Sequence, residues 1–186
     1  MKKSTSSRKP AASKSKAVIK KVLSLDEVRS VFDDQLRKRF WSEKELQLLL
    51  PKLAKRATSY ELATAIDEHL AITEKQVVRL IHVFDALGER AGGIKCDIMA
   101  KWSQDIQTLL SDKNFFGYPA DNAIINVWQK IMKSEILSYI ELREHADVLG
   151  EIKAAALLLT AVNEEKAAHA ILRHVGLSAI YFDQAG

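Results

Sequence analysis

Apolar residues recur at every third or fourth position through most of this chain, the spacing that places side chains on one face of an α-helix. Four long segments show the pattern, at residues 24–53, 58–88, 121–149 and 151–176, and a shorter one covers residues 94–111. The sequence contains no useful length of the apolar–polar alternation that is typical of β-strands. The pattern predicts an all-α protein with four long helices and one short linking helix.

Residues that begin and end helices stand at the borders of these segments. Ser24 with Glu27, and Thr58 with Glu61, have the spacing of capping boxes, in which two side chains satisfy backbone N–H groups of the first turn. Asp121 is a suitable N-cap for the third long helix. Glycines that suit helix C-termini follow the other long segments, at Gly88, Gly150 and Gly176.

Charge divides the chain into a basic beginning and a mildly acidic body. Residues 1–23 contain eight Lys or Arg and no acid, whereas residues 24–186 hold the other 20 cations and all 24 acids, a formal charge of −4. The first segment is too polar to bury a core, so we expect a disordered basic tail at 1–23, a helical bundle at 24–178 and a C-terminal tail at 179–186. The basic tail either contacts nucleic acid non-specifically, through phosphates, or is a solvating extension.

Composition agrees with a globular helical domain. Of the 186 residues, 47% are hydrophobic and only 7 are Gly and 3 Pro. No run approaches the roughly 20 apolar residues that span a bilayer, and no secretory signal is recognisable. The single cysteine, Cys96, cannot form an internal disulfide, which suits a reducing compartment. We therefore expect a cytoplasmic protein that makes no membrane contact.

One glutamate lies within the apolar stripe of each long helix. Separations of 31 residues between the first two and 30 between the last two place them at one level of two helical hairpins. A histidine follows the last glutamate by four residues, hence on the same helix face. The residues are Glu43, Glu74, Glu135, Glu165 and His169.

Buried carboxylates cost on the order of several kcal/mol each unless a proton, a cationic side chain or a metal ion neutralises them. Glu and His side chains that project into a bundle core hold the metals of di-iron and di-manganese carboxylate proteins. The five residues are therefore candidate ligands for iron or manganese. The alternative is that glutamates fall near the stripe by chance and bind no metal, and the pattern leaves both open.

Several motifs occur along the chain in the order typical of one bacterial family. They are the run WSEKELQLLLPKLAKRATSYELATAIDEHLAITEKQVVRL at residues 41–80, Lys95-Cys96, Gln129-Lys130, Glu135, Tyr139, Leu149-Gly150 and Glu164-Glu165-Lys166-Ala167. Over roughly residues 25–175 the chain resembles the YciE/YciF family of bacterial stress-induced, ferritin-like proteins. The resemblance implies a ferritin-like antiparallel four-helix bundle and an association with stress.

The resemblance also implies metal positions, of which this chain keeps a part. The kept positions are Glu43, Glu74, Glu135, Glu164, Glu165 and His169. Another second-helix ligand is replaced by Ala71, and Met132-Lys133-Ser134 stands where the family usually has Glu-His-Tyr. Lys133 is a cation that could pair with a buried carboxylate in place of metal.

These observations support three functions. The first is a stress-associated, ferritin-like protein with a structural or interaction role and a degenerate or absent metal site, which is not an enzyme. The second is a metal-dependent oxidase or peroxide scavenger, and the third is a DNA-associated protective protein anchored by residues 1–23. We also expect a homodimer, because the loop at 111–121 carries an aromatic cluster, Phe115, Phe116 and Tyr118.

Overall fold

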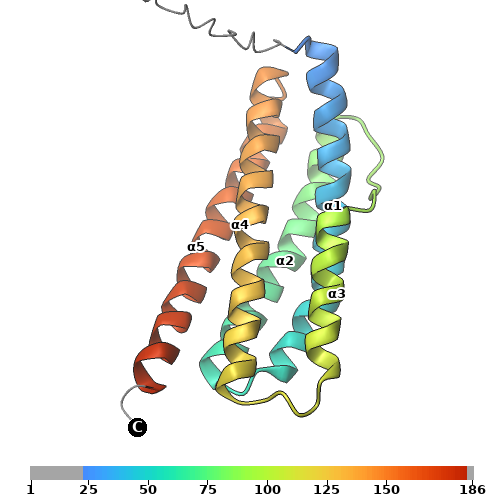
Figure 1. Cartoon of the computed structure of the whole chain (residues 1–186). Helices are drawn as coiled ribbons and strands as arrows, with labels where there is room; N and C mark the ends of the chain where they lie inside the picture. The colour runs from blue at the N-terminus through green and yellow to red at the C-terminus, as the bar shows by residue number, and fades with distance from the viewer. Residues whose placement is uncertain (1–22, 184–186) are drawn as a thin grey trace, which may run out of the picture.

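The computed structural model describes residues 23–183, in which every regular element is an α-helix (Figure 1). The helices are α1 (Leu25–Arg56), α2 (Tyr60–Ala86), α3 (Asp97–Ser111), α4 (Tyr118–Val148) and α5 (Ile152–Asp183). The prediction of four long helices and one short helix is confirmed. The expected basic tail and its nucleic-acid contact fall almost entirely on residues 1–22, which lie outside the described residues.

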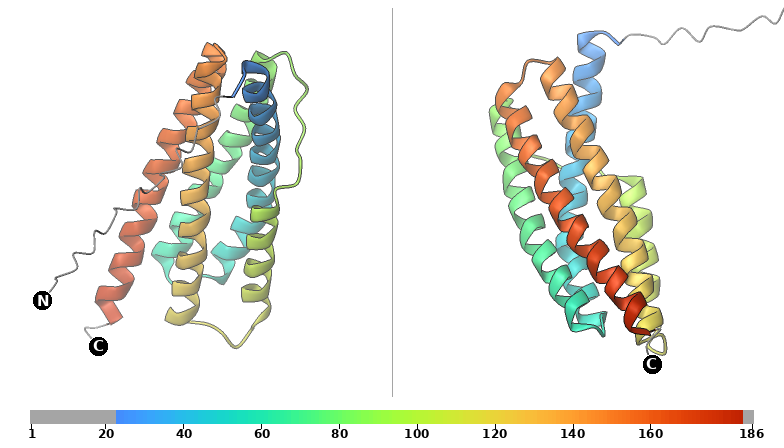
Figure 2. Two further views of the ribbon diagram at one scale, coloured as in Figure 1. Left: turned by 45° about the horizontal axis from the view of Figure 1, so that its top comes forward. Right: turned by 90° about the vertical axis from the view of Figure 1, so that its left-hand side faces the viewer.

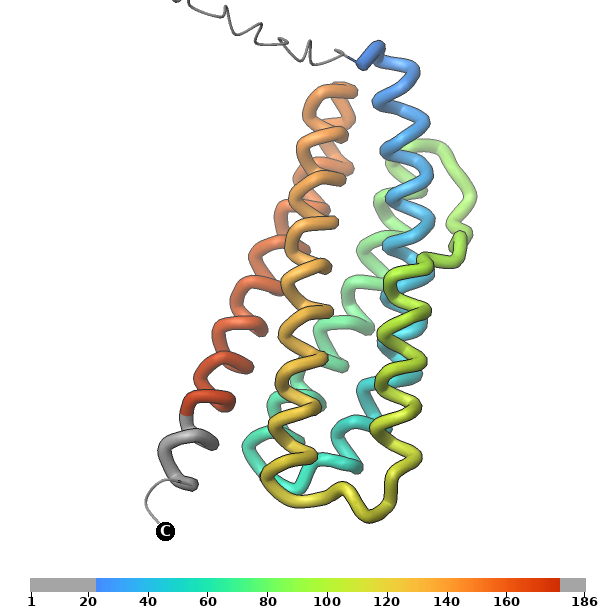
Figure 3. The backbone as a smooth tube through the Cα atoms, in the orientation of Figure 1, coloured from blue at the N-terminus to red at the C-terminus, as the bar shows by residue number. Residues whose placement is uncertain are grey.

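The four long helices form a bundle in which neighbouring helices run antiparallel, whereas α2 and α4, which are joined through α3, run in the same direction (Figures 1 and 2). α1 packs against α2 and α4, and α5 packs against the same two helices from the other side. α3 lies outside this ring and packs against α1 and α4; the tube view shows the extended connection that leads to it from α2 (Figure 3). In the part of the chain that the structure describes, no helix combines the length and apolarity needed to cross a membrane.

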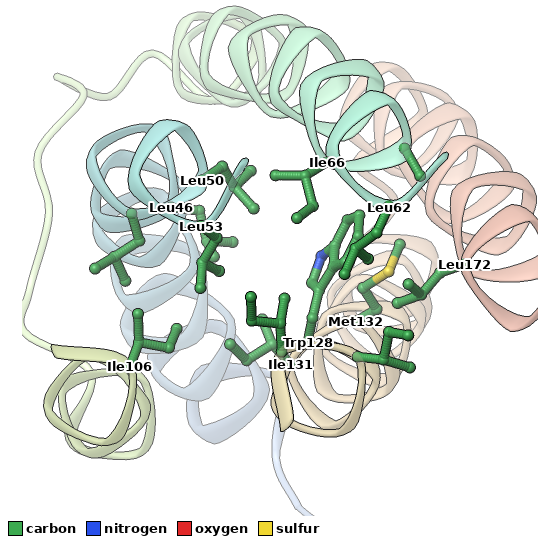
Figure 4. Packing of buried hydrophobic residues seen from close by; sticks show 14 of the residues in the cluster. Leu46, Leu50, Leu53, Leu62, Ile66, Ile106, Trp128, Ile131, Met132 and Leu172 are labelled. Carbon is green, nitrogen blue, oxygen red and sulfur yellow. The ribbon is translucent and has the colours of Figure 1, made fainter. Parts of the chain in front are cut away.

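Two hydrophobic clusters are stacked along the bundle axis. The first joins the C-terminal half of α1 to the start of α2 and α4, with Leu50, Ile66 and Trp128 near its centre (Figure 4). The second surrounds Phe32 and Phe84 at the opposite end of the bundle. Each buried Leu, Ile or Phe side chain stabilises the fold by about 1.5–3 kcal/mol, so the two clusters supply most of the driving force for folding.

Helix borders agree with the sequence at α1 and differ at three other places. At the start of α1, Ser24 Oγ accepts from Glu27 N–H at 3.2 Å and Glu27 Oε2 accepts from Ser24 N–H at 2.8 Å, so the predicted capping box is confirmed. The box predicted at Thr58 is wrong: the N-cap of α2 is Ser59, whose hydroxyl accepts from Leu62 N–H. At the far end, α5 runs through Gly176 to Asp183, past the predicted end of the bundle at 178.

Asp121 is not the N-cap of α4, because α4 begins earlier, after Gly117, whose φ of +72° favours glycine. The Asp121 carboxylate is buried in the first turn of α4 and accepts three hydrogen bonds from the α1–α2 connection. Thr58 N–H and Ser59 N–H each donate at 2.8 Å, and the Thr58 hydroxyl donates at 2.6 Å. Asp121 therefore ties the start of α4 to the turn between the first two helices.

Replacement of Asp121 by Ala is expected to lower the free energy of unfolding by about 2–4 kcal/mol, because two backbone donors and a hydroxyl lose their charged acceptor. Urea denaturation monitored by circular dichroism measures the change. The matched control is Asp105→Ala at an exposed position of α3, which should change stability by less than about 0.5 kcal/mol. Equal stability of the two variants would contradict the proposed role of Asp121.

Candidate functional site

A layer of buried polar side chains separates the two hydrophobic clusters. On α1, for example, Glu43 lies between Phe40 of one cluster and Leu46 of the other. Each long helix contributes to the layer, and every member is at most 6% exposed: Arg39, Glu43, His69, Thr73, Gln76, Glu135 and Glu165. The prediction that glutamates of different helices meet at one level inside the bundle is therefore confirmed for Glu43, Glu135 and Glu165.

Arg39 is the permanent cation of this layer, and the sequence analysis did not identify it. Its Nη2 donates to Glu135 Oε1 at 2.8 Å, and its Nε lies 3.3 Å from Glu43 Oε1. The Tyr139 hydroxyl also donates to Glu43 Oε1, at 2.6 Å. Burial alone lowers the pKa of Arg39, but Glu43 and Glu135 raise it above its ordinary value, so the guanidinium stays charged. Arg39 thus links α1 to α4 through its hydrogen bond to Glu135.

His69 forms a second buried chain of hydrogen bonds, between α4 and α5. The indole N–H of Trp128 donates to His69 Nδ1 at 3.0 Å, and His69 Nε2 lies 3.3 Å from Glu165 Oε2. An indole nitrogen can only donate, so Nδ1 must be the acceptor, and neutral His69 carries its proton on Nε2. Burial lowers the pKa of His69, which favours this neutral form. His69 therefore donates to Glu165 and offers no free ring nitrogen.

Two carboxyl groups of the layer have raised pKa values, which favour their protonated forms. Burial, together with the nearby Glu165, raises the pKa of Glu135 well above its usual range, although Arg39 opposes the shift. Burial and the charge of Glu43 raise the pKa of Glu165 to about 8. The Arg39–Glu43 ion pair and the raised pKa values of Glu135 and Glu165 both reduce the net charge of the layer, which is how a protein interior accommodates several acids.

The remaining predicted ligands lie outside the layer. Glu74 is exposed on the surface of α2, and His169 is half-buried on α5. Burial and the cations Lys133 and Arg173 lower the pKa of His169, so positive rather than negative groups surround it. Lys133 itself is exposed, and the cation that pairs with buried carboxylates is Arg39. The structure therefore brings together three of the five predicted ligands.

The sequence analysis missed His69 because it assigned Glu74 to the interior face of α2, and that face is rotated by one position from the face that the structure buries. The structure buries His69, Thr73 and Gln76, and leaves Glu74 in solvent. Leu80 and Val83 continue the buried series at helical spacing. The neighbouring face continues in the same way with Leu70, Val77 and Ile81, so the apolar pattern alone does not distinguish the two faces. No signal in the sequence marks Arg39 either, since an arginine at a stripe position usually extends to solvent.

A carboxylate-bridged metal pair is the group that the resemblance implies, and the layer meets only part of its requirements. Among the described residues, Glu43, Glu135 and Glu165 each have one enclosed carboxylate oxygen without a hydrogen-bond partner. Three possible ligand atoms lie within 4.8 Å of one another, one each from His69, Glu135 and Glu165. A dinuclear centre needs about six protein ligands, however, and the free lone pair of His69 is engaged by Trp128. A metal ion on these carboxylates would also meet the Arg39 charge, so the residues present do not fit such a centre.

Comparisons with known proteins agree with this fold. The family described as Domain of unknown function (DUF892) matches residues 27–180. The protein YciF of Escherichia coli (strain K12) is 30% identical over 148 residues, which cover 78% of this chain and 87% of YciF. The crystal structure of the E. coli stress protein YciF matches with a TM-score of 0.78 and 28% identity, covering 83% of this chain and 97% of that one. YcfI of Rhodopseudomonas palustris, described as a candidate structural protein, matches with a TM-score of 0.72 and 28% identity, covering 84% and 98% of the two chains.

The raised pKa of Glu165 makes stability depend on pH. The folded state holds this proton up to about pH 8, whereas the unfolded chain releases it near the ordinary pKa of 4.5. The contribution of this proton to the free energy of unfolding is therefore fully present below pH 4.5 and is lost as the pH rises to 8. The free energy of unfolding should fall with a slope of up to about 1.4 kcal/mol per pH unit in this window. Glu165→Gln cannot ionise and should show a shallower fall in urea titrations at several pH values.

The control for this series is Glu74→Gln, which changes an exposed glutamate of α2 and should keep the wild-type slope. Identical pH dependence of Glu165→Gln and the wild type would mean that Glu165 does not hold a proton in the folded protein.

Proposed function

Because the chain belongs to the family described as Domain of unknown function (DUF892) and is related over most of its length to the stress protein YciF, we propose that it is a stress-associated protein with a structural or interaction role rather than an enzyme. The observation that carries this proposal is the buried guanidinium of Arg39 between Glu43 and Glu135. A fixed side-chain cation fills the electrostatic role that metal ions have in redox bundles, but it cannot bind or reduce O2 or peroxide.

The hydrogen bonds of the layer support the same proposal. Glu43 accepts from Tyr139, and Glu165 accepts from His69, whose own orientation is set by Trp128. These contacts join all four long helices and leave the layer as a structural element of the bundle. Its chemistry is that of a proton- and arginine-neutralised core, which agrees with a degenerate metal site.

An interaction role is further supported by aromatic side chains at the surface. In the loop before α4, Phe116 is 68% exposed and Tyr118 begins the helix at 37% exposure. Large exposed aromatic side chains are enriched at sites where proteins meet. The partner that we propose is a second copy of the chain.

Elemental analysis after anaerobic incubation with Fe(II) or Mn(II), followed by removal of unbound metal, tests the absence of a metal centre. We expect well under one metal ion per chain in the wild type, with the same value for Glu135→Gln. A content near two ions per chain that falls in Glu135→Gln would overturn the proposal and would favour the oxidase or peroxide-scavenging alternative.

A second variant separates the role of Arg39 from that of a metal. Arg39→Met leaves Glu43 and Glu135 without their cation, and it should lower the free energy of unfolding by about 3–5 kcal/mol. The loss should be the same with and without EDTA in the buffer. Full recovery of stability on addition of Fe(II) would show instead that the carboxylates form a metal site.

Light scattering after size exclusion tests the homodimer. The wild type should elute with about twice the chain mass of 20.9 kDa, and Phe116→Ser should shift it toward the monomer. The matched control is Leu25→Ser, which removes a side chain of similar exposure, 63%, at the start of α1. A monomeric wild type would contradict the proposed dimer but would not bear on the proposed absence of a metal centre.

A further inference from the structure

A cavity of about 310 Å³ opens between α1, α3 and α4. Figure 1 shows α3 lying along the outside of the bundle beside α1. Its lining comes from all three helices and reaches inward to Arg39 and Glu135 of the polar layer. The volume is at the lower end of the range of small-molecule sites, which suits a ligand with a single ring or a short chain. Three surface depressions beside the described part of α5 are lined by none of the charged residues of the polar layer.

Arg39 supplies a buried cation with unused hydrogen-bonding capacity at the floor of this cavity. The side chain is 5% exposed, and its Nη2 and Nε face Glu135 and Glu43. Its Nη1 makes no hydrogen bond to any described residue, yet Nη1 is not among the fully enclosed polar atoms, which include Nε. The two N–H donors of Nη1 are therefore the groups of Arg39 that a molecule in the cavity can reach.

Other donors face the same space. The N-cap of α3 is Cys96, whose side chain makes no capping bond, so the first turn at Ile98 and Met99 keeps free backbone N–H groups. Lys38 lines the opening; its ammonium group donates to Asp34 at 2.7 Å, and its positive charge also interacts with Cys96 and Asp97. A helix N-terminus and two basic side chains on one cavity favour an anion.

The buried acceptors at the floor of the cavity are already used or enclosed. Glu135 Oε1 accepts from Arg39 and its Oε2 is fully enclosed. Burial raises the pKa of Glu135, which favours the neutral form that does not repel an anion. Glu141 lies at the exposed rim, where its Oε2 accepts from Gln35. The unused polar capacity of the cavity is therefore mainly that of hydrogen-bond donors.

The rest of the lining is apolar and includes an indole ring. Its apolar members are Ile98, Met99, Trp102, Ile131 and Leu137. From the free donors, the apolar walls and the size, we propose that this cavity binds a small carboxylate with an apolar body, such as an aromatic or branched-chain acid. The carboxylate bonds Arg39 Nη1 at the floor, and the body packs against Trp102.

This site goes beyond the proposed function and does not depend on the absence of metal. The probe for it is 4-fluorobenzoate, observed by ¹⁹F NMR during titration with the full-length protein. A ligand of this size should bind with a Kd on the order of 1 mM. Its uncharged counterpart, 4-fluorobenzamide, should bind about tenfold more weakly, because it lacks the charge-assisted hydrogen bond.

Two variants locate the binding without disturbing the buried ion pairs. Ser138→Leu places a larger side chain in the cavity lining and should abolish saturable binding, and Lys38→Gln should weaken it about threefold by removing an exposed charge. The matched control is Ser30→Leu, the same change at an exposed position of α1, which should bind like the wild type. Circular dichroism and urea denaturation establish that each variant is folded.

Each outcome of these titrations tests one part of the proposal. Loss of binding in Ser138→Leu with retention in Ser30→Leu supports the cavity as the site. Equal binding of 4-fluorobenzoate and 4-fluorobenzamide would overturn the anion specificity, and unchanged binding in a folded Ser138→Leu would overturn the location. Absence of saturable binding to the wild type at millimolar probe would overturn the proposal as a whole.

Discussion

The buried contacts of Arg39 with Glu43 and Glu135 are the constraint around which the bundle is arranged. Charged groups in a protein interior are stable only when their partners are held at hydrogen-bonding distance, because water cannot replace a lost partner. Arg39 and Glu43 are on α1 and Glu135 is on α4, so these two helices cannot slide along each other without breaking the hydrogen bond from Arg39 to Glu135. The arginine thereby sets the relative height of two helices that are far apart in sequence.

α2 and α5 supply further polar side chains at the same level of the bundle. Trp128 orients His69, and His69 bonds Glu165, while at the edge of the layer Arg79 binds Glu164 through two hydrogen bonds of 2.8 Å. Hydrophobic contacts alone allow helices several registers, since one apolar side chain replaces another at little cost. A polar layer between two apolar clusters removes that freedom, because its hydrogen bonds form in one register only.

This arrangement also explains how a bundle with acidic residues in its core can remain stable without metal. Three features reduce the cost of burying these acids, namely the guanidinium of Arg39, the raised pKa values of Glu135 and Glu165, and the neutral donors Tyr139 and His69. The helix that lies outside the bundle, α3, covers one flank of the layer and leaves a cavity beside Arg39. Arg39 therefore stabilises the fold and also places a positive charge at the floor of this cavity.

The sequence by itself determined the helical architecture. The spacing of apolar residues predicted the five helices, the Ser24–Glu27 pair predicted the start of α1, and stripe positions identified Glu43, Glu135 and Glu165 as interior acids. These features are local, since a helical face and a capping box depend on residues within a few positions of one another. The motif order further identified the family, which the comparisons confirm.

Only the tertiary structure decided which groups meet inside. The roles of Arg39 and His69 depend on partners 96 residues away along the chain, and no local pattern distinguishes a buried arginine from an exposed one. Glu74 and His69 illustrate the same limit: five residues apart on one helix, they differ in burial because the packing of α2 against α1 and α5 sets the rotation of the helix. Asp121 likewise has the residue type of an N-cap, but it binds the turn before α2, because the position of α4 brings them together. Long-range contacts fix rotation, register and charge pairing, and these decide the chemistry that a helical pattern leaves open.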